Sequence, residues 1–218
     1  MDANATEEQQ IEALKKWWKE NSSSIITGLL LGLAVLFGAR SWFAYQERSA
    51  ENASNIYTTL MTALNSGDYA VVTQNAGMLI ADHSGSPYAS LAALAVARVK
   101  LEQDELEAAR AQLQWALDNA GTTGIRETAR LRLVRVLTAE GKYDEAEALI
   151  NQAGASEAYA RLYRELHGDI HLARGYRASA RAEYEHALAA MKPELPERQL
   201  VQLKYDNKAV LDESGDSQ

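Results

Sequence analysis

Residues 141–146 read GKYDEA, a turn followed by the first residues of a helix. Residues 175–180 (GYRASA) and 104–109 (DELEAA) repeat this layout, and a weaker copy (GDY) precedes them. The copies begin at Gly67, Asp104, Gly141 and Gly175. Their spacings of 37, 37 and 34 residues indicate an internal structural repeat.

The region around these copies has a helical pattern. Apolar residues recur at intervals of three and four residues rather than two, which favours helices over strands. Short breaks separate the predicted helices, at residues 66–68, 84–87, 121–124, 141–142 and 154–155. A helical repeat of this length is typical of tetratricopeptide arrays. We therefore predict an all-α fold in which four helix pairs form an α-solenoid.

Small residues occupy positions where the two helices of a pair should lie close together. They are Gly168, Ala146 and Ala180, and a larger side chain at any of them would push the helices apart. A solenoid also needs a cap on its last face, which we predict as a helix over residues 196–211. The residues expected on its packing stripe are Leu200, Leu203, Val210 and Leu211.

An apolar run precedes the repeats. Residues 25–39 read IITGLLLGLAVLFGA and carry no charge. Extended to Tyr45, the run would form about 31 Å of helix at ~1.5 Å per residue, enough to cross a bilayer. Trp18 and Trp42 flank it about 36 Å apart, as aromatic residues do at the two membrane interfaces. We predict a single N-terminal transmembrane helix over residues 25–45.

The charges beside this helix predict its orientation. Lys15, Lys16 and Lys19 precede it, whereas Arg40 and Arg48 lie towards its other end. This bias favours a cytoplasmic N-terminus and a translocated C-terminal part. The predicted organisation is a leader helix at residues 1–24, the transmembrane helix at 25–45, the repeat domain at 46–211 and a disordered tail at 212–218.

Alternatives remain for the N-terminal region. A cleaved signal peptide is disfavoured, because the leader carries five acidic residues and bulky aromatics follow the span instead of a small-x-small site. The leader is predicted to be an interfacial helix, with a cytosolic recognition role as the alternative.

Gly28 and Gly32 of the predicted transmembrane helix form a GxxxG spacing that lets another helix, or a second copy, approach closely. Glycine is, however, common in membrane helices in general.

The composition excludes several kinds of site. The chain has no cysteine and a formal net charge of −8, so disulfides and thiolate chemistry are absent and a nucleic-acid binder is disfavoured. His167 and His171 are four residues apart, but no third metal ligand is suitably spaced. No catalytic or phosphate-binding motif is present. We predict no enzyme activity, no catalytic residues, no metal and no cofactor.

The candidate binding residues lie on the first helix of each pair, which faces a concave groove in arrays of this type. A mixture of leucines, arginines and acids there suits an extended peptide or a partner helix. The residues are Leu91, Leu94, Arg98 and Leu101 in the second pair, Leu131, Arg135 and Thr138 in the third, and Leu162, Glu165, Asp169 and Leu172 in the fourth. The alternative is that many of these leucines pack between neighbouring repeats.

The order of these features resembles a known family. The segments that carry the resemblance are EEQQIEALKKWW (7–18), YQER (45–48), YASLAALAVA (88–97), ARLRLVRVL (129–137), LHGDIHLARG (166–175) and LKYDN (203–207). Together with the Gly- and Leu-rich span, they are similar to the YfgM family of Gram-negative bacteria, ancillary subunits of the Sec translocon. The likeness runs over nearly the whole chain.

The resemblance implies a single-pass inner-membrane protein with its repeat domain in the periplasm. The implied partners are the SecYEG channel, the periplasmic chaperone PpiD, translocating polypeptides and inner-membrane lipid. The implied function is non-enzymatic transfer of translocated chains to periplasmic chaperones. The alternative from the residues is a self-associating scaffold, a homo-oligomer anchored in the membrane for another envelope complex.

Overall fold

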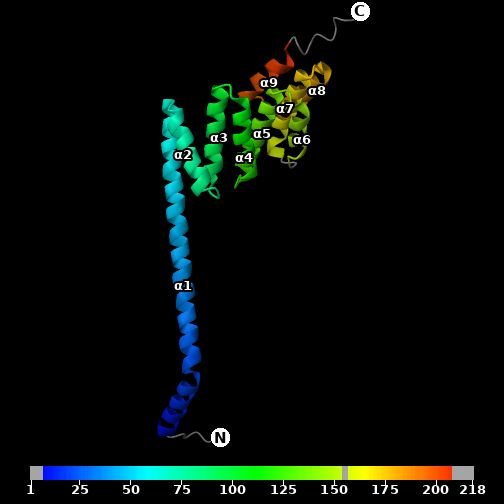
Figure 1. Ribbon diagram of the computed structural model, residues 1–218. Coiled ribbons are helices and arrows are strands. Elements are labelled where there is room, and N and C mark those ends of the chain that lie inside the picture. Colours follow the sequence, from blue (N-terminus) through cyan, green and yellow to red (C-terminus); the bar gives the residue numbers. More distant parts are fainter. Residues whose placement is uncertain (1–6, 154–156, 208–218) are drawn as a thin grey trace, which may run out of the picture. The chain divides into compact units, whose positions relative to one another are not determined.

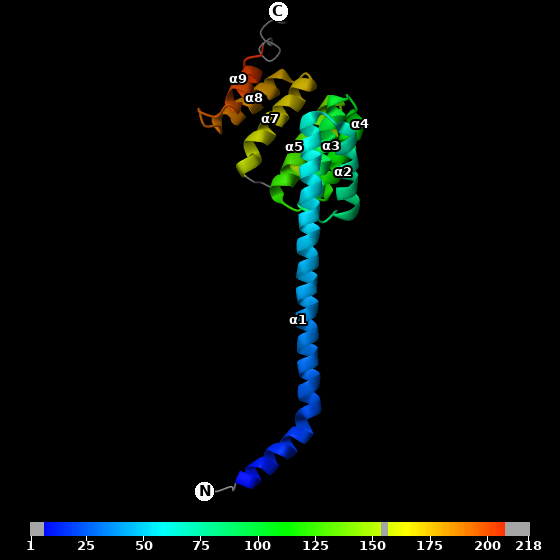
Figure 2. The same ribbon diagram turned by 90° about the vertical axis from the view of Figure 1, so that its left-hand side faces the viewer.

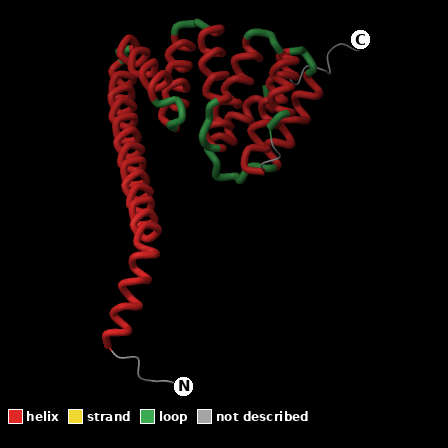
Figure 3. Tube along the Cα trace, turned by 60° about the horizontal axis from the view of Figure 1, so that its bottom comes forward, coloured by secondary structure: helices red, strands yellow, loops and turns green. Residues whose placement is uncertain are grey.

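The computed structural model describes residues 7–153 and 157–207. Helices and their connecting loops account for all of these residues, and no strand occurs among them (Figure 3). The all-α prediction is therefore confirmed. The chain divides into two compact units, Met1–Asn52 and Ala53–Gln218.

The first unit is formed by most of helix α1 (Glu7–Ser66). Among the described residues, α1 alone is long and apolar enough to cross a membrane. Its large apolar side chains between residues 26 and 45 are exposed, as lipid-facing side chains would be. The predicted boundaries at residues 24 and 45 fall inside α1, so no loop marks them. The predicted tail at 212–218 lies outside the described residues.

Helix α1 bends near its start (Figure 2). Asn21 donates a hydrogen bond from Nδ2 to the Trp17 carbonyl at 2.9 Å, and Thr27 donates from Oγ1 to the Ser23 carbonyl at 2.8 Å. Side chains that bond to carbonyls one turn back compete with the helical hydrogen bonds and bend helices. The polar run at residues 21–24 accounts for the bend.

The second unit is an array of helix pairs (Figure 1). The pairs are the end of α1 with α2 (Tyr69–Asp82), α3 (Pro87–Glu102) with α4 (Leu106–Asp118), α5 (Thr123–Ala139) with α6 (Tyr143–Asn151), and α7 (Glu157–Ala173) with α8 (Arg177–Ala189). Helix α9 (Glu197–Tyr205) follows and packs on α8. Four pairs and a terminal helix were predicted, and both are present.

The turn inside each pair has the same backbone conformation. Its first residue has a positive φ, 76° at Gly67, 59° at Asp104, 74° at Gly141 and 83° at Gly175. That residue donates to the carbonyl three positions back, and the next residue donates to the carbonyl five positions back. This is the Schellman motif, which satisfies the last free carbonyls of a helix. The spacing of the repeats in the sequence is therefore the spacing of the residues that end a helix with a left-handed backbone conformation.

Asp104 carries a side chain where the other three turns have glycine. A side chain in the left-handed region costs about 1 kcal/mol relative to glycine. We expect Asp104→Gly to raise the free energy of unfolding by about 0.5–1 kcal/mol, measured by urea denaturation of the full-length protein in detergent. Gly141→Ala should lower it by a similar amount. An unchanged or lower stability of Asp104→Gly would contradict this account of the turns.

One predicted break between helices extends too far towards the C-terminus. Residues 121–124 were expected to be a linker, but α5 begins at Thr123, so Gly124 is helical. The cause is the side chain of Thr122, whose hydroxyl accepts the Ile125 N–H and caps the helix. The break at 154–155 lies outside the described residues.

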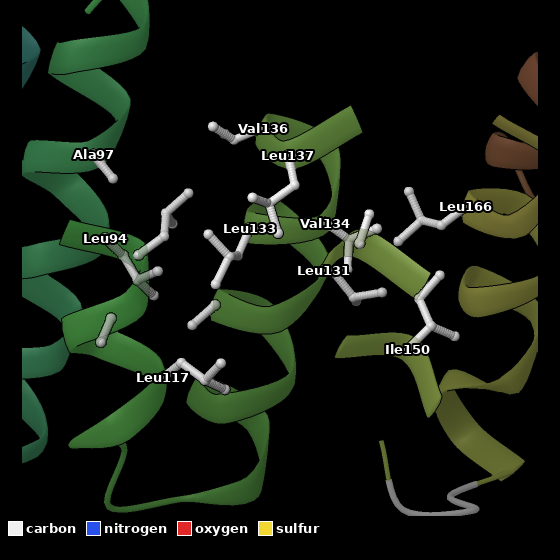
Figure 4. Close-up of a cluster of buried hydrophobic side chains, with 14 of the residues drawn as sticks. Leu94, Ala97, Leu117, Leu131, Leu133, Val134, Val136, Leu137, Ile150 and Leu166 are labelled. Carbon is white, nitrogen blue, oxygen red and sulfur yellow. The ribbon is translucent and has the colours of Figure 1, made fainter. Parts of the chain in front are cut away.

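The core runs through the array between neighbouring helices. Leu94 and Ala97 of α3 face Leu133, Val136 and Leu137 of α5 in Figure 4. A second cluster joins the end of α1 to α2 and α3, and a third joins α8 to α9. Each leucine buried in this way contributes about 1.5–3 kcal/mol, so packing between repeats holds the array together.

Gly168 lies against the ring of Tyr184, where α7 and α8 cross. A Cβ atom at position 168 would lie only 2.7 Å from Cδ1 of that ring and 3.0 Å from Cζ. Ala146 and Ala180 are also fully buried. The prediction that small residues permit close packing within the pairs is confirmed at Gly168.

The residues predicted to form the buried apolar stripe of α9 are wrong. Leu200 and Leu203 are 55% and 69% exposed, whereas Val201 is 1% exposed. Val210 and Leu211 lie outside the described residues. Helix α9 is held on α7 by Lys204, whose Nζ lies 2.7 Å from both Glu165 Oε1 and Asp169 Oδ2. This ion pair turns Val201 inward and leaves the two leucines exposed.

Candidate partner-binding groove

A cavity of about 310 Å³ opens between the first helices of the first three pairs. Its walls come from the end of α1, from α3 and from the start of α5. The lining residues are Tyr57, Met61, Leu64, Leu91, Leu94, Ala95, Arg98, Gly124, Ile125, Thr128 and Arg132. We call this cavity the groove. Most of its lining is apolar, which suits the burial of side chains from a partner.

The charged groups of the groove are arginines. Arg98 Nε lies 2.9 Å from Glu102 Oε1, and Glu102 also accepts a hydrogen bond from the Tyr69 hydroxyl at 2.6 Å. The pKa of Arg132 is below its ordinary value, first because its guanidinium is partly desolvated and then because Arg135 and Arg98 are close. The groove is therefore a positively charged site.

Three of the predicted binding residues meet in the groove. Leu91, Leu94 and Arg98 all line it. Arg135 is exposed, near Arg132. Both residues lie on α5, three positions apart, which places them on neighbouring turns of that helix.

The other predicted leucines of α3, α5 and α7 pack into the array. Leu131 is 7% exposed and belongs to the largest core cluster. Leu101 and Leu162 are partly buried against the same cluster. These three leucines therefore pack between neighbouring repeats, as the alternative interpretation of the sequence predicted.

Asp169 and Leu172 lie on α7, away from the groove lining. Asp169 accepts hydrogen bonds from Lys204 and, at 2.8 Å, from the Tyr184 hydroxyl. Leu172 packs partly buried against the cluster of α8 and α9. Helix α9 thus covers this part of α7.

Sequence reasoning missed one wall of the groove. Tyr57, Met61 and Leu64 line it from the end of α1. Their spacing of four and three residues was a usable signal, since such residues share one face of a helix. Arg132, which also lines the groove, was not among the predicted residues.

Comparison with known proteins identifies the family. A family model described as a tetratricopeptide repeat-like domain matches residues 15–210. A Haemophilus influenzae protein is 32% identical over 92% of this chain and 97% of its own length. Proteins of Escherichia coli and Neisseria gonorrhoeae are 29% and 28% identical over at least 95% of this chain. All three are named ancillary SecYEG translocon subunit.

The chain belongs to this family. The match covers the apolar helix as well as the repeat array, since the aligned part is 96% of this chain for the Escherichia coli relative. The resemblance seen in the sequence is confirmed.

The glycines of the span leave an open strip on α1 in this family member. A Cβ atom built on Gly28 or Gly32 meets no atom within 4 Å. A strip without side chains lets a second helix come close enough for extensive van der Waals contact.

The described residues show no site for metal chemistry. Across residues 7–153 and 157–207, no group of three or more His, Cys, Asp or Glu side chains could hold a metal ion. His167 and His171 have ring centroids 6.3 Å apart. Burial lowers the pKa of His167 below its ordinary value.

Proposed function

We propose that this chain is a non-enzymatic accessory subunit of the Sec translocon. Its repeat domain would bind partner proteins in the groove and help to transfer translocated chains to periplasmic chaperones, PpiD among them. The proposal is carried by one observation: a chain that matches an ancillary SecYEG translocon subunit over 97% of that relative's length has an open, mostly apolar groove.

The proposed location is the bacterial inner membrane, with a cytoplasmic N-terminus and a periplasmic repeat domain. The apolar part of α1 supports the single span. Lys15, Lys16 and Lys19 before the span support the orientation, because cytoplasmic flanks carry the excess of positive charge.

The proposed mechanism is tethering. A binding module anchored beside the channel is present at a high effective concentration, on the order of millimolar for short tethers. Weak contacts in the groove then suffice to hold an emerging chain, and weak contacts also allow its release to a chaperone. The strip at Gly28 and Gly32 is the proposed contact with the helices of the channel.

Site-specific photo-crosslinking in cells tests this proposal. We expect a crosslinking amino acid at Met61 or Thr128, both half-buried in the groove, to yield adducts with translocating chains or periplasmic chaperones. At Gly28 we expect adducts with the Sec channel. The matched control is the exposed Gln74 on α2, which is not a groove residue. Self-adducts alone would instead support the membrane-anchored scaffold.

A further inference from the structure

The groove is basic although the protein is acidic. The whole chain has a formal net charge of −8. Among the residues that line the groove, Arg98 and Arg132 are charged and none is Asp or Glu. The groove therefore has the opposite sign to the protein as a whole, which is the pattern of a surface complementary to a negative partner.

The arginines at the groove are only partly neutralised. Arg98 pairs with Glu102, but in the described parts of the chain no hydrogen bond or ion pair joins Arg132 or Arg135 to an acidic group. The pKa of Arg132 is lowered, first because its guanidinium is partly desolvated and then because the positive charges of Arg135 and Arg98 are near it. Clustered like charges reduce stability, so a bound carboxylate would relieve an existing cost.

The rest of the lining restricts the form of the partner. Tyr57, Met61 and Leu91 offer an apolar surface beside the arginines. A guanidinium can bind a carboxylate through two parallel hydrogen bonds. An acidic side chain next to apolar side chains, as in a peptide, could use both parts of the groove at once.

We propose that the groove binds an acidic peptide segment of a partner protein, with carboxylates on Arg98 and Arg132 and apolar side chains against α1 and α3. This inference rests on the proposed function and adds the chemistry of the partner. Binding neutralises the arginine cluster, so the bound protein is more stable than the free protein.

The test measures peptide binding to the full-length protein in phosphatidylcholine nanodiscs by fluorescence anisotropy. The probe is a labelled 12-residue peptide that repeats Asp-Leu-Glu-Ser, and its matched control repeats Asn-Leu-Gln-Ser. We expect the acidic peptide to bind at least tenfold more tightly than the control peptide. We also expect its affinity to fall as sodium chloride is added, because salt screens the ion pairs.

Single substitutions locate the binding. Arg132→Gln should weaken binding of the acidic peptide about tenfold and leave binding of the neutral peptide unchanged. The matched control is Arg177→Gln, which removes the same charge from an exposed position on α8 and should change neither affinity. Arg132→Gln should also melt no lower than the parent protein, because the substitution removes repulsion.

The outcomes separate this inference from the proposed function. Equal affinity for the two peptides, or equal losses in Arg132→Gln and Arg177→Gln, would overturn the acidic preference and leave a groove that binds neutral segments. Binding of neither peptide would overturn the inference, while crosslinks in cells would still decide the proposed function. Displacement of the probe by phosphatidylglycerol vesicles, but not by phosphatidylcholine vesicles, would assign the arginines to lipid.

The chain's own C-terminal residues are the remaining occupant to test. Residues 210–213 read VLDE, which is itself apolar and acidic. A chain shortened to end at Asn207 should bind the acidic peptide as the full chain does. A tenfold gain in affinity would show that the chain's own terminal residues fill the groove, and the assignment to a partner protein would be wrong.

Discussion

Replacing Glu127 with alanine is expected to lower the free energy of unfolding by about 3–5 kcal/mol. Glu127 of α5 is buried, and its carboxylate accepts hydrogen bonds from buried Arg130 and from the hydroxyl of Tyr163 on α7. Alanine leaves the Arg130 guanidinium buried without a counter-charge. It also removes the acceptor that joins the third helix pair to the fourth.

Urea denaturation of the full-length protein in detergent, followed by circular dichroism, measures this effect. The matched control is Glu105→Ala, because Glu105 pairs with Lys100 at 2.8 Å but is half exposed; we expect a loss of about 1 kcal/mol or less. The double variant Glu127→Leu, Arg130→Met should recover most of the stability, since it leaves no buried charge. A loss of less than 1 kcal/mol in Glu127→Ala would contradict the role of this network.

The same network predicts a dependence on alkaline pH. Burial, and then the hydrogen bond to Glu127, raises the pKa of Tyr163 from 10.0 to about 12. A raised pKa means that the folded protein holds this proton more tightly than the unfolded chain. The contribution of the network to the free energy of unfolding is therefore fully present below about pH 10 and is lost as the pH rises through about 12.

Gly168→Ala is expected to cost about 1–3 kcal/mol, although alanine is the better helix former. The added methyl group would overlap the ring of Tyr184, which is fully buried and donates its hydroxyl to Asp169. The ring cannot move without breaking that hydrogen bond or separating α7 from α8.

Gly77→Ala is the matched control for this substitution. Gly77 is in the middle of α2, and a Cβ atom there meets no atom within 4 Å. The same change should therefore stabilise the protein by about 0.5–1 kcal/mol, through helix propensity alone. The two variants should differ in sign in the same denaturation experiment. Stabilisation by both would show that the packing of α7 on α8 tolerates a side chain at position 168.

The repeat was predictable because its signal is local. A helix that ends in the left-handed conformation usually needs glycine, so Gly67, Gly141 and Gly175 mark the turns directly. Asp104 was found by spacing and by the apolar pattern after it. The transmembrane helix was predictable for a similar reason, since its length and apolar composition are properties of one segment.

The groove was only partly predictable because it is formed by three helices. The first helix of the first pair is the end of α1, and periodicity does not show where a lipid-facing helix becomes a domain helix. Tyr57 and Met61 were missed for that reason. In the short helix α9, two apolar stripes one residue apart both fit the sequence, and the ion pair of Lys204 with α7 selects the stripe of Val201. Polar residues such as Glu127 read as surface residues until the neighbouring helix is known.

Co-purification tests the central claim most directly. Full-length protein with an affinity tag, expressed at its natural level and extracted from membranes with a mild detergent, would be analysed by mass spectrometry. The account predicts that the subunits of the Sec channel are recovered with it. The double substitution Gly28→Leu, Gly32→Leu is expected to reduce this recovery. Recovery of a different envelope complex, or of the protein alone, would contradict the account.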